Sequence, residues 1–304
     1  MHTDPISPAD DTAAGLIARA DDALRRADVA TALAAASAAV TAAQPGRERT
    51  VARRLHGDAL QLGGDRLAAR AEYDLALAEA MATGDDSEAM LLHNGIGVTA
   101  KFTGEVYLAA THYGHALAIL QARGGDDAML GGLHHNLGGL AHTRGDLTEA
   151  ERHTRAALEL SQRVNPAGAC ADRGQLGSIL SELGRHDEAM SLLRQAAEEF
   201  AAVLGPDHVE VAIARTTLGA ALHRAGRLDE AALAYTEGLV ARERALGADH
   251  PELAATLLNL GQLAADQGDT ATARAYAGRA VQVLQGKVVA DHPFLRLAQE
   301  RARP

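Results

Sequence analysis

The chain contains 14 histidines, and some of them are spaced so that two imidazoles would share one face of a helix. His112 and His115 are three residues apart, and His153 follows later in the chain. Imidazole nitrogens are common ligands of zinc, copper and iron, so these three side chains are candidate metal ligands. The simpler interpretation is that they are solvent-facing polar residues on an outer helix, and on that interpretation we expect no metal and no cofactor.

Other residues with catalytic potential are isolated from partners. His135 and His142 lie two helical turns apart and could titrate near neutral pH, but no carboxylate or nucleophile is identifiable beside them. The single cysteine, Cys170, has no histidine close in sequence, which favours a buried thiol over a nucleophile. The phosphate-binding pattern G-x-x-x-x-G-K-[ST] is absent. The sequence therefore favours a protein without catalytic residues, with an enzyme or accessory protein built on the histidines as the alternative.

Charge and hydropathy exclude several classes of partner. The net charge is −11, and lysine occurs only at Lys101 and Lys287, whereas nucleic-acid binding needs clustered positive charge. No apolar run approaches the ~20 residues of a membrane span. Residues 1–12 are polar, which predicts a disordered tail and no signal peptide. One cysteine and no leader predict a cytoplasmic protein, and the excess of arginine over lysine suggests a bacterial source.

The secondary-structure elements that must position these residues can be predicted from an internal sequence repeat. A glycine, a second glycine seven residues later and an alanine five residues further on recur at steps of 37 to 42 residues. The copies are Gly57/Gly64/Ala69, Gly97/Gly104/Ala109, Gly138/Gly145/Ala150, Gly177/Gly184/Ala189, Gly219/Gly226/Ala231 and Gly261/Gly268/Ala273, preceded by the degraded copy Ala20/Ala27/Ala32. The chain therefore consists of seven similar units.

Each unit is predicted to be a helical hairpin. Apolar residues at spacings of three and four, such as Leu253 and Leu257, precede the second glycine and indicate an amphipathic helix. The first glycine costs that helix about 1 kcal/mol relative to alanine, so its recurrence predicts a close contact with the alanine of the second helix. The second glycine suits the left-handed conformation that ends a helix, and Asp65, Asp146 and Asp269 follow it as N-caps.

This skeleton resembles the tetratricopeptide repeat. The joints "GPDHVEVA", "GADHPELA" and "VADHPFLR" are similar to those of its kinesin light chain subclass. The resemblance implies an all-α, right-handed superhelical solenoid of seven helical hairpins over residues 13–290. Residues 291–304 start like an eighth unit and are predicted to form a C-terminal capping helix.

The resemblance also implies that the first helices of the hairpins line a concave groove that binds a protein or peptide segment. The groove candidates are first-helix residues that packing does not use: Arg54, Asn94, Lys101, His135, Asn136, His142, His223, Arg224 and Asn259. Asn136 and Asn259 match the asparagine that kinesin-light-chain-like repeats use to bind a ligand backbone, a role that suits an amide because it both donates and accepts. The alternative is that these amides only solvate the groove or brace neighbouring helices. The other repeats depart from the pattern at that position, with Leu55, Gly95, Gln175 and Thr217.

We therefore predict a non-catalytic scaffold or adaptor that binds a protein or peptide in its groove. Counting the charges expected in the groove gives four basic against four acidic side chains, so charge selects no ligand. A sensor or regulatory partner of a separate transcription factor is a further alternative, and no residue pattern specifies an oligomeric state.

Overall fold

The computed structural model describes residues 11–289 and 291–303, and all regular secondary structure within them is α-helical. The all-α prediction is therefore confirmed. Most of the predicted tail at residues 1–12 lies outside the described residues. The chain divides into two compact units, residues 1–144 (unit 1) and residues 145–304 (unit 2).

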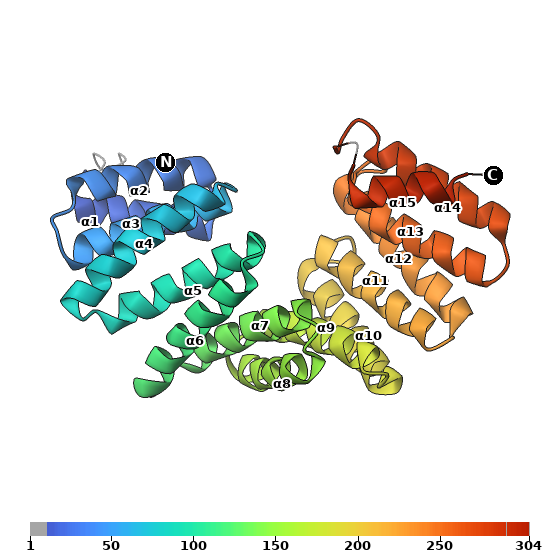
Figure 1. Ribbon diagram of the computed structural model, residues 1–304, viewed down its shortest axis with the longest axis horizontal. Coiled ribbons are helices and arrows are strands. Elements are labelled where there is room, and N and C mark those ends of the chain that lie inside the picture. The colour runs from blue at the N-terminus through green and yellow to red at the C-terminus, as the bar shows by residue number, and fades with distance from the viewer. Residues whose placement is uncertain (1–10, 290, 304) are drawn as a thin grey trace, which may run out of the picture. The chain divides into compact units, whose positions relative to one another are not determined.

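Unit 1 contains three hairpins followed by a single helix (Figure 1). Its helices are α1 (Ala13–Arg25), α2 (Val29–Ala42), α3 (Arg47–Leu62), α4 (Arg66–Thr83), α5 (Asp86–Phe102), α6 (Val106–Ala122) and α7 (Asp127–Thr143). Consecutive helices pack against each other throughout this unit.

Unit 2 begins with a single helix, continues with three hairpins and ends with a short helix (Figure 1). Its helices are α8 (Leu147–Val164), α9 (Pro166–Glu182), α10 (His186–Leu204), α11 (Val209–Arg224), α12 (Leu228–Leu246), α13 (Leu253–Asp266), α14 (Thr270–Leu284) and α15 (Pro293–Arg301). The short α15 packs on both α13 and α14, where a capping helix was expected.

The first helices of the hairpins also touch one another. Contacts join α1 to α3, α3 to α5 and α5 to α7 in unit 1, and α9 to α11, α11 to α13 and α13 to α15 in unit 2. Among the described residues, no such contact joins the second helices α2, α4 and α6, or α10, α12 and α14. Each unit is therefore curved with its first helices on the inner side, and we call that side the groove face.

The first anchor glycine makes room for an aromatic ring. A Cβ atom at Gly57 would lie 2.5 Å from the ring of Tyr73, and one at Gly219 would lie 2.6 Å from the ring of Tyr235. Both rings are buried. The predicted glycine-to-alanine contact is therefore wrong in these hairpins, because the glycine faces the residue one turn beyond the alanine.

The alanine recurs at the same position of each repeat for a related reason. Ala69 and Ala231 are completely buried, so their small side chains let the second helix lie close enough for the ring to reach the glycine. Two hairpins also have the predicted pair: a Cβ atom at Gly177 would meet the Ala189 carbonyl oxygen at 3.2 Å, and one at Gly261 would meet the Ala273 carbonyl oxygen at 3.3 Å.

The second anchor glycine ends the first helix in the left-handed region, as predicted. Gly64, for example, has a φ of 89°. Asp65 then accepts a hydrogen bond from the Ala68 amide at 3.1 Å, and Asp269 caps α14 in the same way. In the degraded first unit, Ala27 holds the same conformation with a φ of 55°, which is costly for a residue with a Cβ atom.

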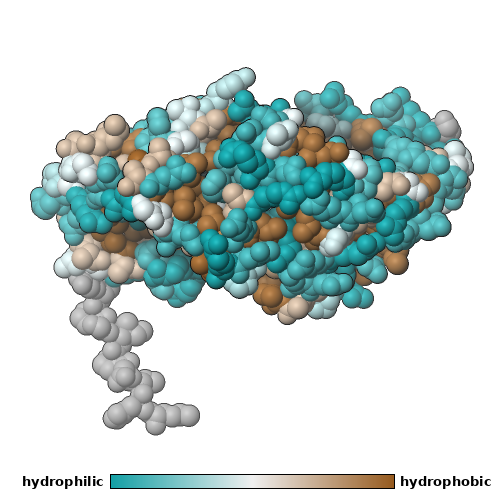
Figure 2. Space-filling view, turned by 90° about the horizontal axis from the view of Figure 1, so that it is seen from below, coloured by the Kyte–Doolittle hydropathy of each residue, from teal (hydrophilic) through white to brown (hydrophobic). Residues whose placement is uncertain are grey.

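No helix in the described ranges is both long enough and apolar enough to cross a bilayer. On the face drawn in Figure 2, hydrophilic side chains predominate and apolar side chains form scattered patches.

Filling the anchor position should destabilise the hairpin. We expect Gly219→Ala to lower the free energy of unfolding by about 2 kcal/mol, because its Cβ atom collides with Tyr235. Gly261→Ala should cost less, since the nearest atom is 3.3 Å away. Gly278→Ala in α14 is the control: nothing lies within 4 Å, so helix propensity should raise stability by about 0.5–1 kcal/mol. Equal thermal melts for all three variants would contradict the ring contact.

The left-handed position gives a second, independent test. Ala27→Gly should stabilise unit 1 by up to about 1 kcal/mol, because glycine removes the steric cost of a positive φ. Gly64→Ala should destabilise it by a similar amount, and the cause must be the backbone, since no atom lies within 4 Å of the added carbon. Urea unfolding measures both changes, and shifts in the same direction would refute this account.

Candidate functional site

The predicted groove residues all lie on first helices. In unit 1, α3 carries Arg54, α5 carries Asn94 and Lys101, and α7 carries His135, Asn136 and His142; in unit 2, α11 carries His223 and Arg224, and α13 carries Asn259. All are half-buried except the exposed Arg224. They therefore line the groove faces of two units, and each face is described by itself.

Two asparagines form a bridge between neighbouring first helices in unit 1. The Asn136 Nδ2 group on α7 donates to Asn94 Oδ1 on α5 at 3.2 Å. Each amide keeps further hydrogen-bonding capacity, since a primary amide offers two donors and an acceptor with two lone pairs. The bracing role and the ligand role considered for Asn136 are therefore compatible.

The charge of Arg54 is neutralised inside the protein. Its Nε donates to Glu88 at 2.8 Å and its Nη1 to Asp58 at 3.0 Å. Burial opposes the charged form, but the two carboxylates outweigh it and raise the pKa of Arg54. Tyr73 donates to the other oxygen of Asp58 at 2.8 Å, so the anchor ring is part of this network.

Lys101 differs from Arg54, because no hydrogen bond or ion pair engages it among the described residues. Its side chain is half-buried, and that burial lowers its pKa. The neighbouring Phe102 is 63% exposed and lies beneath the guanidinium of Arg66, 5.0 Å from the ring centroid.

The groove residues of α11 are bonded to neighbouring first helices. His223 Nε2 lies 2.8 Å from Asp266 Oδ2 on α13, and Arg224 Nη1 donates to Ser181 Oγ on α9 at 3.2 Å. Gln262 also donates to Asp266, and hydrogen bonds from Gln262 and His223 lower the pKa of that carboxyl. On this face Asp266 therefore accepts from two side chains, whereas Arg224 donates to an uncharged hydroxyl group.

A cavity of about 240 Å³ opens on the groove face of unit 2 between α9 and α11. Small residues of α9, Gly174 and Ser178, leave the space, and Phe200 and Ile213 contribute apolar walls. Gln175 also lines it, and its Oε1 atom is buried without a hydrogen-bond partner among the described residues.

Sequence analysis missed the importance of Gln175. It stands two residues before the anchor Gly177, the position that Asn136 and Asn259 occupy in their own repeats. It was treated as a departure from the asparagine pattern, although its side chain ends in the same amide group. Searching this position for any side chain that ends in an amide, and not for asparagine alone, would have identified Gln175.

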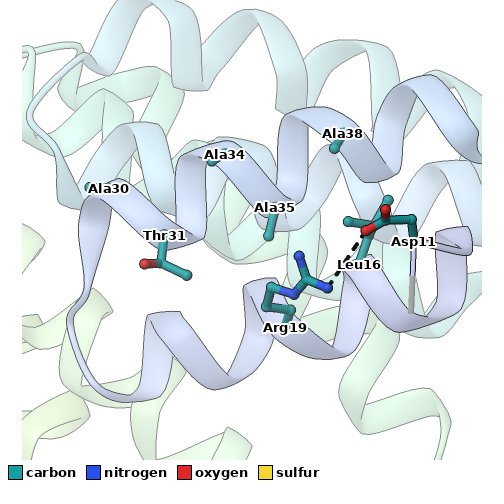
Figure 3. Close-up of a pocket in the computed structure, with 8 residues that line it drawn as sticks. All are labelled: Asp11, Leu16, Arg19, Ala30, Thr31, Ala34, Ala35 and Ala38. Atoms are coloured by element: carbon teal, nitrogen blue, oxygen red, sulfur yellow. Dashed lines mark ion pairs between the residues drawn. The ribbon is translucent and has the colours of Figure 1, made fainter. Parts of the chain in front are cut away.

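Another cavity, of about 600 Å³, lies beside α1 and α2 (Figure 3). Half of its lining residues are alanines, and its charged groups, Arg19 and Asp11, are paired with each other at 3.8 Å. It offers a ligand little beyond methyl groups.

Three histidines of unit 1, His93, His112 and His115, form a cluster. His93 Nδ1 on α5 lies 2.9 Å from His112 Nδ1 on α6, and the His93 and His115 ring centroids are 4.9 Å apart. Burial, followed by the charges of His112 and His115, lowers the pKa of His93 to about 4. Burial likewise lowers the pKa of His112.

The third metal candidate, His153, has different neighbours. It is buried on α8, and its Nε2 lies 2.8 Å from Arg152 Nη2 and 3.7 Å from Glu149 Oε2. Within residues 11–289 and 291–303, no group of three or more His, Cys, Asp and Glu side chains is arranged to hold a metal ion. The sequence pattern singled out His112 and His115 but not His93, because His93 lies on a different helix.

Cys170 is a buried thiol, as its sequence setting favoured. Its Sγ lies 3.3 Å from Glu199 Oε2, and burial together with that carboxylate raises its pKa to about 11. The thiol is therefore protonated at neutral pH and is a weak nucleophile.

The histidine cluster predicts a loss of stability on acidification. An unfolded histidine binds a proton near pH 6.5, whereas folded His93 does so only near pH 4, so the unfolded state holds more protons between these values. The free energy of unfolding should fall by about 2–3 kcal/mol as pH drops through that window.

Thermal melts of the wild type and of His93→Gln between about pH 7 and pH 4.5 test this effect. The variant should lose much of the pH dependence, while His135→Gln, outside the cluster in the same unit, should retain it. A wild-type slope that survives in His93→Gln would refute the assignment.

Comparisons with known proteins agree with this architecture. Tetratricopeptide repeat family models match residues 169–242 and residues 253–294. No curated protein matches the chain.

Solved structures share the fold at low sequence identity. BtubC from P. vanneervenii is 22% identical, with a TM-score of 0.60 over 77% of this chain and 92% of that one. The apo form of the quorum sensor NprR from B. thuringiensis is 14% identical, with a TM-score of 0.74 over 94% and 80%. NprR in complex with its cognate peptide NprX is 15% identical, with a TM-score of 0.69 over 97% and 84%. The family matches show that the chain contains tetratricopeptide repeats in residues 169–242 and 253–294, and the solved structures show that the same fold extends over most of the chain.

Proposed function

We propose that this protein is a non-catalytic scaffold that binds a peptide or an extended protein segment on its groove face. The observation that carries the proposal is the buried Gln175 Oε1 atom, which lacks a hydrogen-bond partner beside the cavity between α9 and α11. An unsatisfied buried acceptor costs about 1–3 kcal/mol, so a ligand that donates to it recovers that free energy.

A peptide backbone has the chemical groups that the cavity beside Gln175 can bind. Its N–H group is a donor, and turning the terminal amide of Gln175 about its last side-chain torsion would present the oxygen to the cavity. The volume of about 240 Å³ beside Phe200 and Ile213 accommodates one apolar side chain of the ligand. The fold similarity to NprR, whose structure with a cognate peptide is known, supports a peptide as the ligand class.

The groove face of unit 1 would contribute in the same way. Asn94 and Asn136 retain hydrogen-bonding capacity, and Lys101 supplies a charge that no carboxylate of the described residues neutralises. A ligand carboxylate or backbone carbonyl would satisfy it.

Gln175→Leu should affect binding and stability in opposite directions. We expect the affinity for a peptide selected from an immobilised peptide library to fall about tenfold, equivalent to about 1.4 kcal/mol. Thermal stability should stay equal or rise, because the variant removes an unsatisfied acceptor. Gln282→Leu, exposed on α14, is the matched control and should change neither quantity. Unchanged affinity, or a destabilised Gln175 variant, would sink the proposal.

In unit 1, Lys101→Ala combined with Asn136→Ala should weaken binding of a captured partner about tenfold or more. Helical content should be unchanged, since neither residue belongs to the contact between glycine and ring. Fluorescence polarisation and circular dichroism measure the two quantities. Wild-type affinity in the double variant would remove unit 1 from the binding surface.

A further inference from the structure

A cavity of about 520 Å³ lies where the last hairpin of unit 2 meets α15. Small residues form its floor: Gly261, Ala265 and Ala273. Three guanidinium groups stand around it: Arg274, Arg301 and Arg303. We call this site the arginine pocket.

The pocket exists because the last helix is short. α15 has nine residues, whereas α13, the preceding first helix, has 14. The turn end of the hairpin is therefore left partly uncovered, and Ala273 is half-exposed. The equivalent alanines of other hairpins, such as Ala69 and Ala231, are completely buried.

The three arginines also lack the carboxylate partners that most arginines of this chain have. In the same unit Arg244 pairs with Asp207 at 3.1 Å. By contrast, Arg274 Nε donates only to the Thr270 carbonyl at 3.2 Å, and Arg301 Nη1 only to the Leu258 carbonyl at 3.4 Å.

No ion pair within 4 Å involves Arg303 among the described residues. The charge of Arg301 helps to lower the pKa of Asp266, but that carboxylate already accepts from Gln262 and lies 2.8 Å from His223. The pocket thus keeps uncompensated positive charge in a chain whose net charge is −11.

We propose that the arginine pocket binds an acidic peptide segment, with carboxylates on the guanidinium groups and an adjoining apolar side chain on the alanine floor. Arginine matches carboxylate geometry with two parallel hydrogen bonds, which gives direction as well as affinity. The apolar floor and the volume exceed what a small inorganic anion uses and fit a side chain beside the charge. The pocket is separate from the Gln175 cavity, since the two share no lining residue.

The test uses the full chain and a fluorescent peptide of alternating leucine and glutamate, blocked at both ends. Arg274→Gln combined with Arg301→Gln should weaken its binding about tenfold or more. Arg296→Gln removes the same charge from the exposed side of α15 without touching the pocket, and it should keep affinity within about twofold. Ala265→Glu gives a second variant at an exposed position, where a new negative charge should abolish binding while the melt stays intact.

Three results would overturn the proposal. The first is an Arg296→Gln loss as large as that of the pocket variant, which would indicate general electrostatic attraction. The second is equal binding of the peptide with lysine in place of glutamate. The third is displacement by inorganic phosphate as effective as by unlabelled peptide, which would indicate a simple anion site. Gln175→Leu should leave this binding unchanged, so failure of the groove proposal and failure of this one are distinguishable.

Discussion

The contact between a glycine backbone and a large buried side chain of the second helix sets the geometry on which the rest of this protein depends; that side chain is a tyrosine ring at Gly57, Gly97 and Gly219 and Leu193 at Gly177. The first helix has no side chain at Gly57, so the buried ring of Tyr73 on the second helix packs directly against the backbone of the first helix. That contact fixes which side of the first helix is used for packing. The opposite side becomes the groove face, so the placement of Asn94, Gln175 and their neighbours follows from an interaction on the other side of the helix.

Much of this architecture was predictable because it depends on local and periodic rules. The positive φ of Gly64 and the capping bond of Asp65 follow from backbone sterics and from unsatisfied amides at a helix start, both of which act over a few residues. The partner of the first glycine was not predictable in the same way. The spacing pointed to the alanine, but the ring one turn later reaches further and fills the space.

Site chemistry was less predictable, because it depends on residues brought together from different helices. Nothing in the spacing of Arg54 indicated that Glu88 on α5 would neutralise it, and His93 joins His112 only because α5 and α6 pack side by side. The exposed Arg301 lines a cavity only because α15 stops short over the last hairpin. The two surfaces that we propose for binding therefore differ in character: the groove face has charges that are mostly paired internally, and the end pocket has charges that are not.

Because the chain has only two lysines, Lys101 on the groove face is a practical site for attaching a fluorescent label. Lys287 donates to the Asp249 carbonyl, whereas Lys101 has no partner among the described residues, and burial lowers its pKa. A lysine amine reacts with acylating reagents only in its neutral form, and the lowered pKa of Lys101 raises the fraction of its side chain in that form. A fluorophore attached there by ordinary amine chemistry would sit on the groove face of unit 1. Occupancy of that surface could then be followed by fluorescence without engineering a cysteine, and the buried Cys170 would not compete for the label.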